Sequence, residues 1–304
     1  MKKYIWCIIY GLFLLAFTAY VMLDTFVITR VYTTVPSDDT DSSTLGKGST
    51  SSIGIPNSSI ITANSYTDDA ISIIITEYRE NDTSIYVADV KLSSADCLKT
   101  AFAENTYGKN ITEKTSEIAA NNNAILAING DYYGTQERGY VLRNGVLYRS
   151  VSDSGQEDLV IHGDGSFEII NESNVSANDL YNDGARQILS FGPALVEDGE
   201  ISVTTRDEVG KAMASNPRTA IGIIDDLHYV FVVSDGRTSE SEGLTLYELA
   251  EFMQTLDVDI AYNLDGGGSS TMVFNGKVIN NPTTSGGRIK ERSVSDIVFI
   301  GYGN

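Results

Sequence analysis

The 304-residue chain has few of the side chains that hold transition metals or form cross-links: it contains two cysteines and two histidines. Cys7 lies in an N-terminal apolar segment and Cys97 stands alone in the body. This arrangement excludes a disulfide within one domain and a cysteine-rich metal cage. His162 and His228 each stand beside a predicted turn, and we interpret both as structural. A multi-histidine metal site is therefore not expected.

Positive charge is also scarce, with 21 Lys and Arg against 41 Asp and Glu and a formal net charge of −20. Nucleic-acid binding needs a net basic surface, so the balance argues against a nucleic-acid partner. It does not exclude a local cluster of arginines in a cleft. The acidic excess favours solubility, and 42% apolar composition is enough for a substantial core.

An uncharged, largely apolar run lies at the N-terminus, from Tyr4 to Leu23. A membrane-spanning helix needs about 20 apolar residues, so this run is long enough to cross a bilayer. No clean cleavage site follows it, and Lys2 and Lys3 should remain in the cytoplasm. We predict a signal anchor over residues 1–30, single-pass in the cell membrane, with the body outside the cytoplasm. A cleaved signal peptide is the alternative.

Downstream, composition divides the chain into two parts. Residues 31–59 are rich in Ser, Thr, Asp and Gly and predict a stalk, because such a segment buries too little apolar area to order itself. Residues 60–304 predict one folded domain of the α+β class, with a mixed, largely antiparallel β-sheet core flanked by a few helices.

Hydrophobic periodicity and turn signals place the elements of this domain. Helices are predicted over 93–103, over 112–122 with Thr112 as a cap, and over 245–256. Strands and hairpins are predicted at 71–76, 85–92, 124–128, 140–149 around Asn144-Gly145, 158–161 with 167–170, 186–191, 194–202 around Asp198-Gly199, 216–222 with 229–234, 260–264, 269–274 and 297–300.

Three of the apolar strands end in short polar clusters: Asn129/Asp131, Asp235/Arg237 and Asn263/Asp265. After Asp265 come three consecutive glycines, Gly266 to Gly268. Consecutive glycines cost backbone entropy, which indicates a positive φ or a ligand that touches the backbone. We expect the three strand ends to converge on one cleft.

Four motifs resemble the phosphodiester glycosidase family: Asn129-Gly-Asp-Tyr-Tyr133, Pro217-Arg-Thr-Ala-Ile-Gly222, Ser234-Asp-Gly-Arg237 and Asn263-Leu-Asp-Gly-Gly-Gly-Ser-Ser-Thr-Met272. The closing Arg292-Ser-Val-Ser-Asp296 fits the same pattern. The resemblance covers roughly Ile71 to Tyr302. It implies that residues 60–304 form a catalytic domain that hydrolyses the C1–O bond of a sugar-1-phosphodiester. The chain lacks the many cysteines of the animal members, so we expect a bacterial member. Outside a bacterial cell the substrate would be an envelope or exopolysaccharide-type glycan, such as teichoic acid or capsule.

The site roles follow from the chemistry of this bond. Glycosidases ordinarily use two carboxylates, and a phosphate leaving group adds charge that a forked arginine can hold. We predict Asp265 and Asp131 as the carboxylates facing the sugar, with Asp235 as a further catalytic candidate. The predicted substrate-binding residues are Asn129, Tyr132, Arg218, Arg237, Asn263, Gly266, Gly267, Gly268, Ser269, Ser270 and Arg292.

Two other functions stay open. The body is alternatively a non-catalytic envelope module that binds anionic glycans, with the carboxylates as hydrogen-bond acceptors. It is alternatively a metal-dependent phosphodiesterase, with Asp131, Asp235 and Asp265 as oxygen ligands for Mg²⁺ or Ca²⁺. No cofactor and no metal ligand is predicted, although a divalent cation is left open. The predicted partners are a carbohydrate phosphodiester, polymeric or not, and the membrane.

Overall fold

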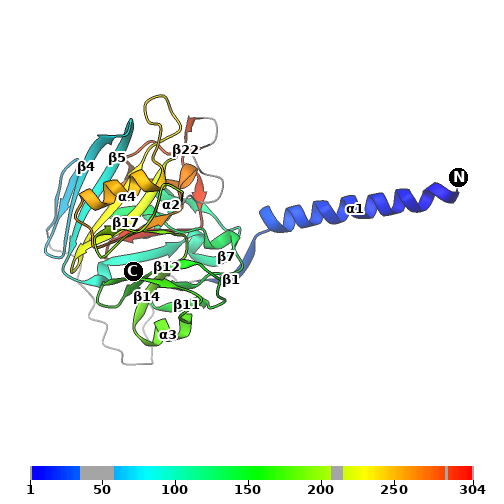
Figure 1. Ribbon diagram of the computed structural model, residues 1–304, viewed down its shortest axis with the longest axis horizontal. Helices are drawn as coiled ribbons and strands as arrows, with labels where there is room; N and C mark the ends of the chain where they lie inside the picture. Colours follow the sequence, from blue (N-terminus) through cyan, green and yellow to red (C-terminus); the bar gives the residue numbers. More distant parts are fainter. Residues whose placement is uncertain (1, 35–57, 207–214, 285–286, 303–304) are drawn as a thin grey trace.

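The computed structural model describes residues 2–34, 58–206, 215–284 and 287–302 (Figure 1). Helix α1 (Lys2–Phe26) projects away from the body. The span Tyr4–Phe26 has a mean hydropathy of 2.1, and none of it is buried against the rest of the protein. By length and composition α1 meets the requirements of a membrane-spanning helix. A signal sequence meets the same requirements.

The body is built around three antiparallel sheets. The largest has the order β16-β15-β19-β17-β18-β5-β4-β3-β2. Its strands are β16 (Glu200–Ile201), β15 (Ala194–Glu197), β19 (Ile260–Leu264), β17 (Arg218–Asp225), β18 (His228–Ser234), β5 (Thr83–Leu92), β4 (Ile71–Glu80), β3 (Ser65–Thr67) and β2 (Ile60–Ile61). The prediction of a largely antiparallel α+β fold is confirmed.

The other two sheets have five strands each. One has the order β21-β20-β9-β25-β6 and comprises β21 (Lys277–Val278), β20 (Met272–Phe274), β9 (Leu126–Asn129), β25 (Asp296–Ile300) and β6 (Leu98–Phe102). The second has the order β11-β10-β14-β12-β13 and comprises β11 (Val146–Arg149), β10 (Val141–Arg143), β14 (Ala185–Leu189), β12 (Glu157–His162) and β13 (Phe167–Asn171).

Short elements complete the body. Three strand pairs stand outside the large sheets: β1 (Arg30–Thr34) with β7 (Thr106–Lys109), β8 (Glu113–Lys114) with β24 (Ser293–Val294), and β22 (Thr283–Thr284) with β23 (Arg288–Ile289). The α-helices of the described body are α2 (Thr115–Asn121), α3 (Ala177–Asn182) and α4 (Leu246–Thr255), and 3₁₀ turns occupy Ala95–Cys97, Ala103–Asn105, Tyr133–Thr135 and Gly267–Ser269.

The main hydrophobic core draws on all three large sheets, with Phe231 from β18, Leu126 from β9 and Leu159 from β12 among its fully buried members. Because strand side chains alternate between faces, each strand gives one apolar face to this core. The opposite face of the nine-stranded sheet packs against α4, through Leu249 and Met253. The predicted helix over 245–256 is thus confirmed.

The N-terminus of α4 is set by Thr245. Its hydroxyl accepts a hydrogen bond from the Glu248 amide at 3.1 Å, and the Glu248 carboxylate accepts one from the Thr245 amide at 2.8 Å. This reciprocal pair is a capping box, which satisfies two amides that the helix itself leaves without partners. The hairpin turns are confirmed as well: Asn144-Gly145 and Asp198-Gly199 all have positive φ.

Two predicted helices need correction. Residues 93–103 form only a 3₁₀ turn followed by β6, because Leu98, Thr100 and Phe102 alternate in burial and the strand pairs along its whole length with β25. The second helix begins at Thr115 rather than near Thr112, because residues 113–114 pair with β24. Thr112 is therefore not the cap.

The stalk prediction is wrong for its first residues. Residues 30–34 form β1, which pairs with β7 on the body, and residues 35–57 lie outside the described part. Gly108 on β7 permits this pairing, because a Cβ there would overlap the carbonyl oxygen of Arg30. Asn110 Nδ2 also donates to the carbonyls of Thr25 and Ile28 at 3.2 and 3.0 Å. Only residues 27–29 separate α1 from β1.

Candidate active site

A cavity of about 220 Å³ lies where the strand ends meet. Its lining residues include six predicted site residues, and we call it the arginine cavity after three of them. It is lined by Phe191, Asn216, Arg218, Arg237, Leu264, Asp265, Gly266, Gly267 and Arg292.

The ends of β9 and β19 meet behind this cavity, although the two strands belong to different sheets. Asn129 Nδ2 donates to the Asp265 carbonyl at 2.6 Å, and its Oδ1 accepts from Thr219 Oγ1 at 2.9 Å. The Asp265 amide in turn donates to the Gly130 carbonyl at 3.3 Å. The predicted convergence of these two ends is confirmed. Asn129 is fully buried, so its contacts hold the Asp265 backbone rather than line the cavity.

Among the described residues that line the arginine cavity, Asp265 is the one carboxyl. Burial raises its pKa to about 6. Two neighbours oppose the rise: Ser269 Oγ donates to Asp265 Oδ2 at 2.5 Å, and the charge of Arg292 lowers the same pKa. Arg292 Nη1 also donates to Ser269 Oγ at 3.3 Å. The carboxyl is therefore oriented by a short relay from Arg292 through Ser269.

The glycines after Asp265 make room for neighbouring groups. Gly267 has φ +61°, and a Cβ there would lie 2.8 Å from Arg237 Nη2. A Cβ on Gly266 would lie 2.9 Å from the Pro217 carbonyl oxygen. The positive φ expected from the glycine run is confirmed at Gly267. At Gly268 the nearest atom to a Cβ would be 3.5 Å away, which is ordinary contact.

The three arginines come from separate segments. Arg218 begins β17 and is buried, and its Nε donates to the Leu244 carbonyl at 2.8 Å. Arg237 follows β18, and its Nε and Nη2 donate to Asn216 Oδ1 at 3.1 and 2.9 Å. Within the described residues, neither Arg237 nor Arg292 forms a salt bridge. Three guanidinium groups around one carboxyl favour an anionic ligand such as phosphate.

Asp131 does not line the arginine cavity. It is 2% exposed, and its oxygens accept from Arg143 Nη2 at 2.7 Å, the Ser190 amide at 3.0 Å and the Tyr133 amide at 2.9 Å. Arg143 also donates to Asp296 Oδ2 at 2.8 Å. The prediction that Asp131 faces the sugar is therefore not supported by its placement, because its acceptor positions are directed inward.

The Asp131–Arg143–Asp296 network is fully buried beside the site. Burial and the nearby Asp131 raise the pKa of Asp296 to about 8, although Arg143 opposes the rise. Asp296 closes the last sequence motif, and its carboxylate would overlap a Cβ on Gly130, which explains the glycine between Asn129 and Asp131. Nothing in the sequence predicted the ion pairs of Arg143, because the only feature indicated near it was the turn at Asn144-Gly145.

Asp235 also lies away from the arginine cavity. Its carboxylate accepts from the Asn281 amide at 2.8 Å and from Asn281 Nδ2 at 3.0 Å. It borders a different cavity, of about 360 Å³, together with Arg79 and Ser241. Its bonds to the 280–281 loop indicate that it orders this loop beside the end of β18, while Arg237 two residues later reaches the arginine cavity.

Of the remaining predicted residues, some are buried and one is exposed on the surface. Asn263 is 1% exposed and donates to the Gly192 carbonyl at 2.7 Å, and Ser270 is fully buried. Tyr132 is 42% exposed and lies outside the cavity lining. Three lining residues were missed: Phe191, Asn216 and Leu264, the last of which lies between Asn263 and Asp265 in their motif. Asn216 stands directly before the Pro217 motif, whereas Phe191 had no sequence signal beyond its place after a predicted strand.

Comparison with known proteins agrees with this geometry. The family model described as phosphodiester glycosidase matches residues 122–301, more than half of the chain. The chain belongs to the phosphodiester glycosidase family. All of the lining residues of the arginine cavity fall within the part that matches the family model.

Relatives of this chain include the SPbeta prophage-derived uncharacterized protein YomE of Bacillus subtilis, 30% identical over 201 residues, which are 64% of this chain and 31% of YomE. The N-acetylglucosamine-1-phosphodiester alpha-N-acetylglucosaminidase of Mus musculus is 46% identical over 66 residues, 22% of this chain and 13% of that protein. The chain thus covers less than a third of the length of these curated relatives.

Two solved structures share the phosphodiester glycosidase fold of this chain. The zebrafish N-acetylglucosamine-1-phosphodiester alpha-N-acetylglucosaminidase catalytic domain, auto-inhibited by its pro-peptide, matches with TM-score 0.60 and 22% identity over 76% of this chain and 82% of that chain. A hypothetical protein from Synechocystis matches with TM-score 0.56 and 14% identity over 77% of this chain and 62% of that chain. At these identities the matches show the fold alone.

Proposed function

We propose that this protein hydrolyses glycosyl phosphodiesters at the C1–O bond, releasing the free sugar and leaving a phosphomonoester on the acceptor. The observation that carries the proposal is the arginine cavity, which among the described residues is lined by three arginines and by one carboxyl, Asp265, whose pKa is about 6. Family membership and the activity named for the mouse relative support it.

In this mechanism the arginines hold the phosphate and Asp265 acts at the anomeric carbon. When the C1–O bond breaks, its electron pair stays on the phosphate oxygen, and the guanidinium groups stabilise the added charge. A phosphate leaves without being protonated, so a second carboxyl acting as acid is not required. Asp265 either takes the proton of the attacking water, or it attacks C1 itself and forms a glycosyl ester that water then hydrolyses, which frees the sugar and the carboxyl. Asn129 and the Gly130 carbonyl hold the Asp265 backbone in place.

The geometry gives less support to the alternative hypothesis of a metal-dependent phosphodiesterase. Asp131 is paired with Arg143 and Asp235 accepts amide hydrogen bonds, so neither directs its oxygens toward Asp265. In the described part of the chain, no group of three His, Cys, Asp or Glu side chains is arranged to hold a metal ion. The hypothesis of a glycan-binding module places the ligand in the same cavity and differs from the hydrolase hypothesis only in that the ligand is not cleaved.

We also place this activity at the outer face of the cell membrane, with α1 as the anchor and the body among envelope or exopolysaccharide-type glycans. The 23-residue apolar span of α1 supports the anchor. Lysines beside a span tend to stay in the cytoplasm, which places the body on the outer side.

The test uses the full chain in detergent, because a protein starting at residue 60 would lack β1. It is incubated with a UDP-sugar and a panel of sugar-1-phosphodiesters, and free sugar and phosphomonoester are followed separately, with and without a chelator. Free sugar with phosphate left on the acceptor is the expected result. Release of sugar 1-phosphate, abolished by chelation, would favour the phosphodiesterase. Saturable binding without turnover would favour the glycan-binding module.

A further inference from the structure

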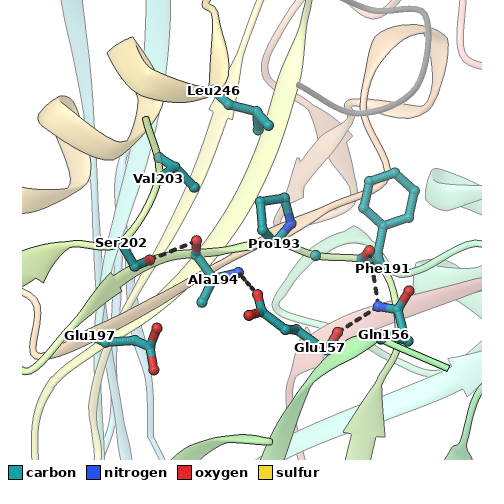
Figure 2. Close-up of a pocket in the computed structure, with 11 residues that line it drawn as sticks. Gln156, Glu157, Phe191, Pro193, Ala194, Glu197, Ser202, Val203 and Leu246 are labelled. Atoms are coloured by element: carbon teal, nitrogen blue, oxygen red, sulfur yellow. Dashed lines mark hydrogen bonds between the residues drawn. The ribbon is translucent and has the colours of Figure 1, made fainter. Parts of the chain in front are cut away.

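A second cavity, of about 470 Å³, shares Phe191 with the arginine cavity. It also involves Glu157, Pro193, Glu197, Val203 and Leu246, and we call it the glutamate pocket (Figure 2). The partition between the two cavities is the segment that runs from Phe191 to Pro193. None of the predicted site residues lines this pocket.

The arginine cavity alone is small for the proposed substrate. Small-molecule sites usually measure about 300–1,000 Å³, and the arginine cavity measures about 220 Å³. A glycosyl phosphodiester carries a sugar on one side of its phosphate and an alcohol on the other. At least one of these groups must therefore extend into neighbouring space, and the glutamate pocket is large enough to take it.

The two cavities carry opposite charge. Glu157 and Glu197 are the titratable side chains of the glutamate pocket, and in the described part of the chain neither forms a salt bridge. Burial, followed by the charge of Glu157, raises the pKa of Glu197. No basic residue lines this pocket among those described. A phosphate is repelled there and attracted by the three arginines next to it, so the charge pattern orients the substrate.

The walls of the glutamate pocket differ in polarity. Figure 2 shows Val203 and Leu246 on one side and the carboxylates of Glu157 and Glu197 on the other, with Phe191 at the edge. A sugar ring likewise has an apolar C–H face and hydroxyl donors around its rim. Carboxylates accept hydrogen bonds from such hydroxyls, and the aromatic and aliphatic side chains suit the C–H face.

The partition is tied to the strand that carries Asp265. Asn263 Nδ2 donates to the Gly192 carbonyl at 2.7 Å, and the Asn263 amide donates to the Pro193 carbonyl at 3.2 Å. Asn263 stands two residues before Asp265 on β19. Arg237, by contrast, lies against Gly267, beyond Asp265. The glutamate pocket thus lies beside the strand whose end carries the carboxyl that must meet the anomeric carbon.

We propose that the glutamate pocket is the subsite for the sugar ring, and that Glu157 and Glu197 restrict it to uncharged or ammonium-bearing sugars and reject acidic sugars such as uronates. This inference rests on the proposed function, because it assumes a sugar bonded to a phosphate. It adds the substrate class: neutral or amino-sugar 1-phosphodiesters.

The test measures binding, so that it does not depend on turnover. Calorimetric titrations of the full chain in detergent compare inorganic phosphate, a hexose 1-phosphate and the matching hexuronic acid 1-phosphate. Repulsion of a uronate by the half-buried Glu157 and the exposed Glu197 predicts about a tenfold preference for the uncharged sugar. The double variant Glu157→Gln/Glu197→Gln should bring this ratio close to one and leave phosphate affinity unchanged. Glu200→Gln removes an exposed charge outside the pocket and serves as the matched control.

Equal affinity for both sugar phosphates in the wild type would overturn the proposal, as would a ratio that survives the double variant. A sugar phosphate that binds no better than inorganic phosphate would overturn it too. The outcome is separable from the enzymatic proposal. If the protein hydrolyses phosphodiesters but shows no preference for uncharged sugars, only the subsite proposal is wrong. If it shows the preference but no hydrolysis, the subsite proposal is retained and the proposed glycosidase activity is wrong.

Discussion

At Asp265 three influences set one carboxyl. Burial raises its pKa, while the Ser269 hydroxyl and the Arg292 charge lower it, and the balance is about 6. A carboxylate at this value is mostly ionised near neutral pH and is more basic than an ordinary aspartate, which suits a base or a nucleophile. The same balance has a cost, because the charged form is less stable inside the fold than in water.

Replacing Asp265 with Asn should therefore abolish turnover and stabilise the fold at neutral pH. The folded pKa of about 6 lies above the ordinary value of 3.8, so the associated stability is present below about pH 4 and lost as the pH rises through 6. At pH 8 the gain for D265N should be on the order of 1–3 kcal/mol, and at pH 4 it should vanish. Thermal or denaturant melts at both pH values measure it. Wild-type turnover by D265N would refute the catalytic assignment.

Ser269 offers a test through the pH profile. If Asp265 acts in its ionised form, kcat/KM should fall below an apparent pKa near 6. Ser269→Ala removes a hydrogen bond that lowers this pKa, so the acid limb should move to higher pH while the plateau rate changes less. Ser72→Ala on β4, far along the sheet, is the control. An acid limb that stays in place would show that Ser269 does not act on Asp265.

The arginines should act on the phosphate rather than on the sugar. Arg218→Ala and Arg237→Ala should each weaken binding of a sugar 1-phosphate by about 10- to 100-fold, since a charged hydrogen bond contributes about 1.5–3 kcal/mol. Binding of the free sugar should change little. Arg288→Ala, an exposed arginine outside the cavity, controls for the loss of net charge. Equal losses for both ligands would assign these arginines a structural role instead.

At the scale of elements, the sequence predicted those helices and turns whose conformation is determined by residues close to one another in the chain. Turns that need positive φ, such as Asn144-Gly145, and the capped helix α4 are determined by the residue types at neighbouring positions. β6 was missed because its strand state depends on pairing with β25, almost 200 residues later, which overrides a helix-like pattern. The site shows the same division. Asp265 and its arginines stood in motifs, whereas the ion pair of Arg143 with Asp131 depends on how separate segments pack.

The β1–β7 pair provides a test of one such long-range contact. Gly108→Ala places a Cβ against the Arg30 carbonyl oxygen, so it should detach β1 and leave the large sheets intact. Hydrogen exchange should then show lost protection in residues 30–34 and 106–109, and unchanged protection in β4 and β5. Gly163→Ala, where the nearest atom to a Cβ would be 3.4 Å away and φ is not positive, is the control. Unchanged protection of β1 in G108A would contradict the packing described.

For the whole molecule, this pairing determines how far the site stands from the membrane. Residues 35–57 follow β1, so they do not lengthen the connection between α1 and the body. The connection is residues 27–29, and three extended residues span at most about 10 Å. If α1 spans the membrane, we expect the body to lie against the bilayer surface and predict that it acts on glycosyl phosphodiesters within reach of that surface, such as lipid-anchored ones.

Energy transfer in proteoliposomes tests this arrangement. A donor dye is attached to a cysteine introduced at exposed Ser239 in a Cys7→Ser background, and the acceptor is a headgroup-labelled lipid. A 20-residue Gly/Ser insertion between residues 28 and 29 adds a flexible tether with an end-to-end distance of about 25 Å. It should lower the transfer efficiency and reduce cleavage of a lipid-anchored substrate relative to a soluble one. The same insertion between residues 50 and 51 leaves the tether unchanged and should have neither effect. If both insertions lower the transfer equally, residues 35–57 contribute to the tether and β1 does not hold the body at the membrane.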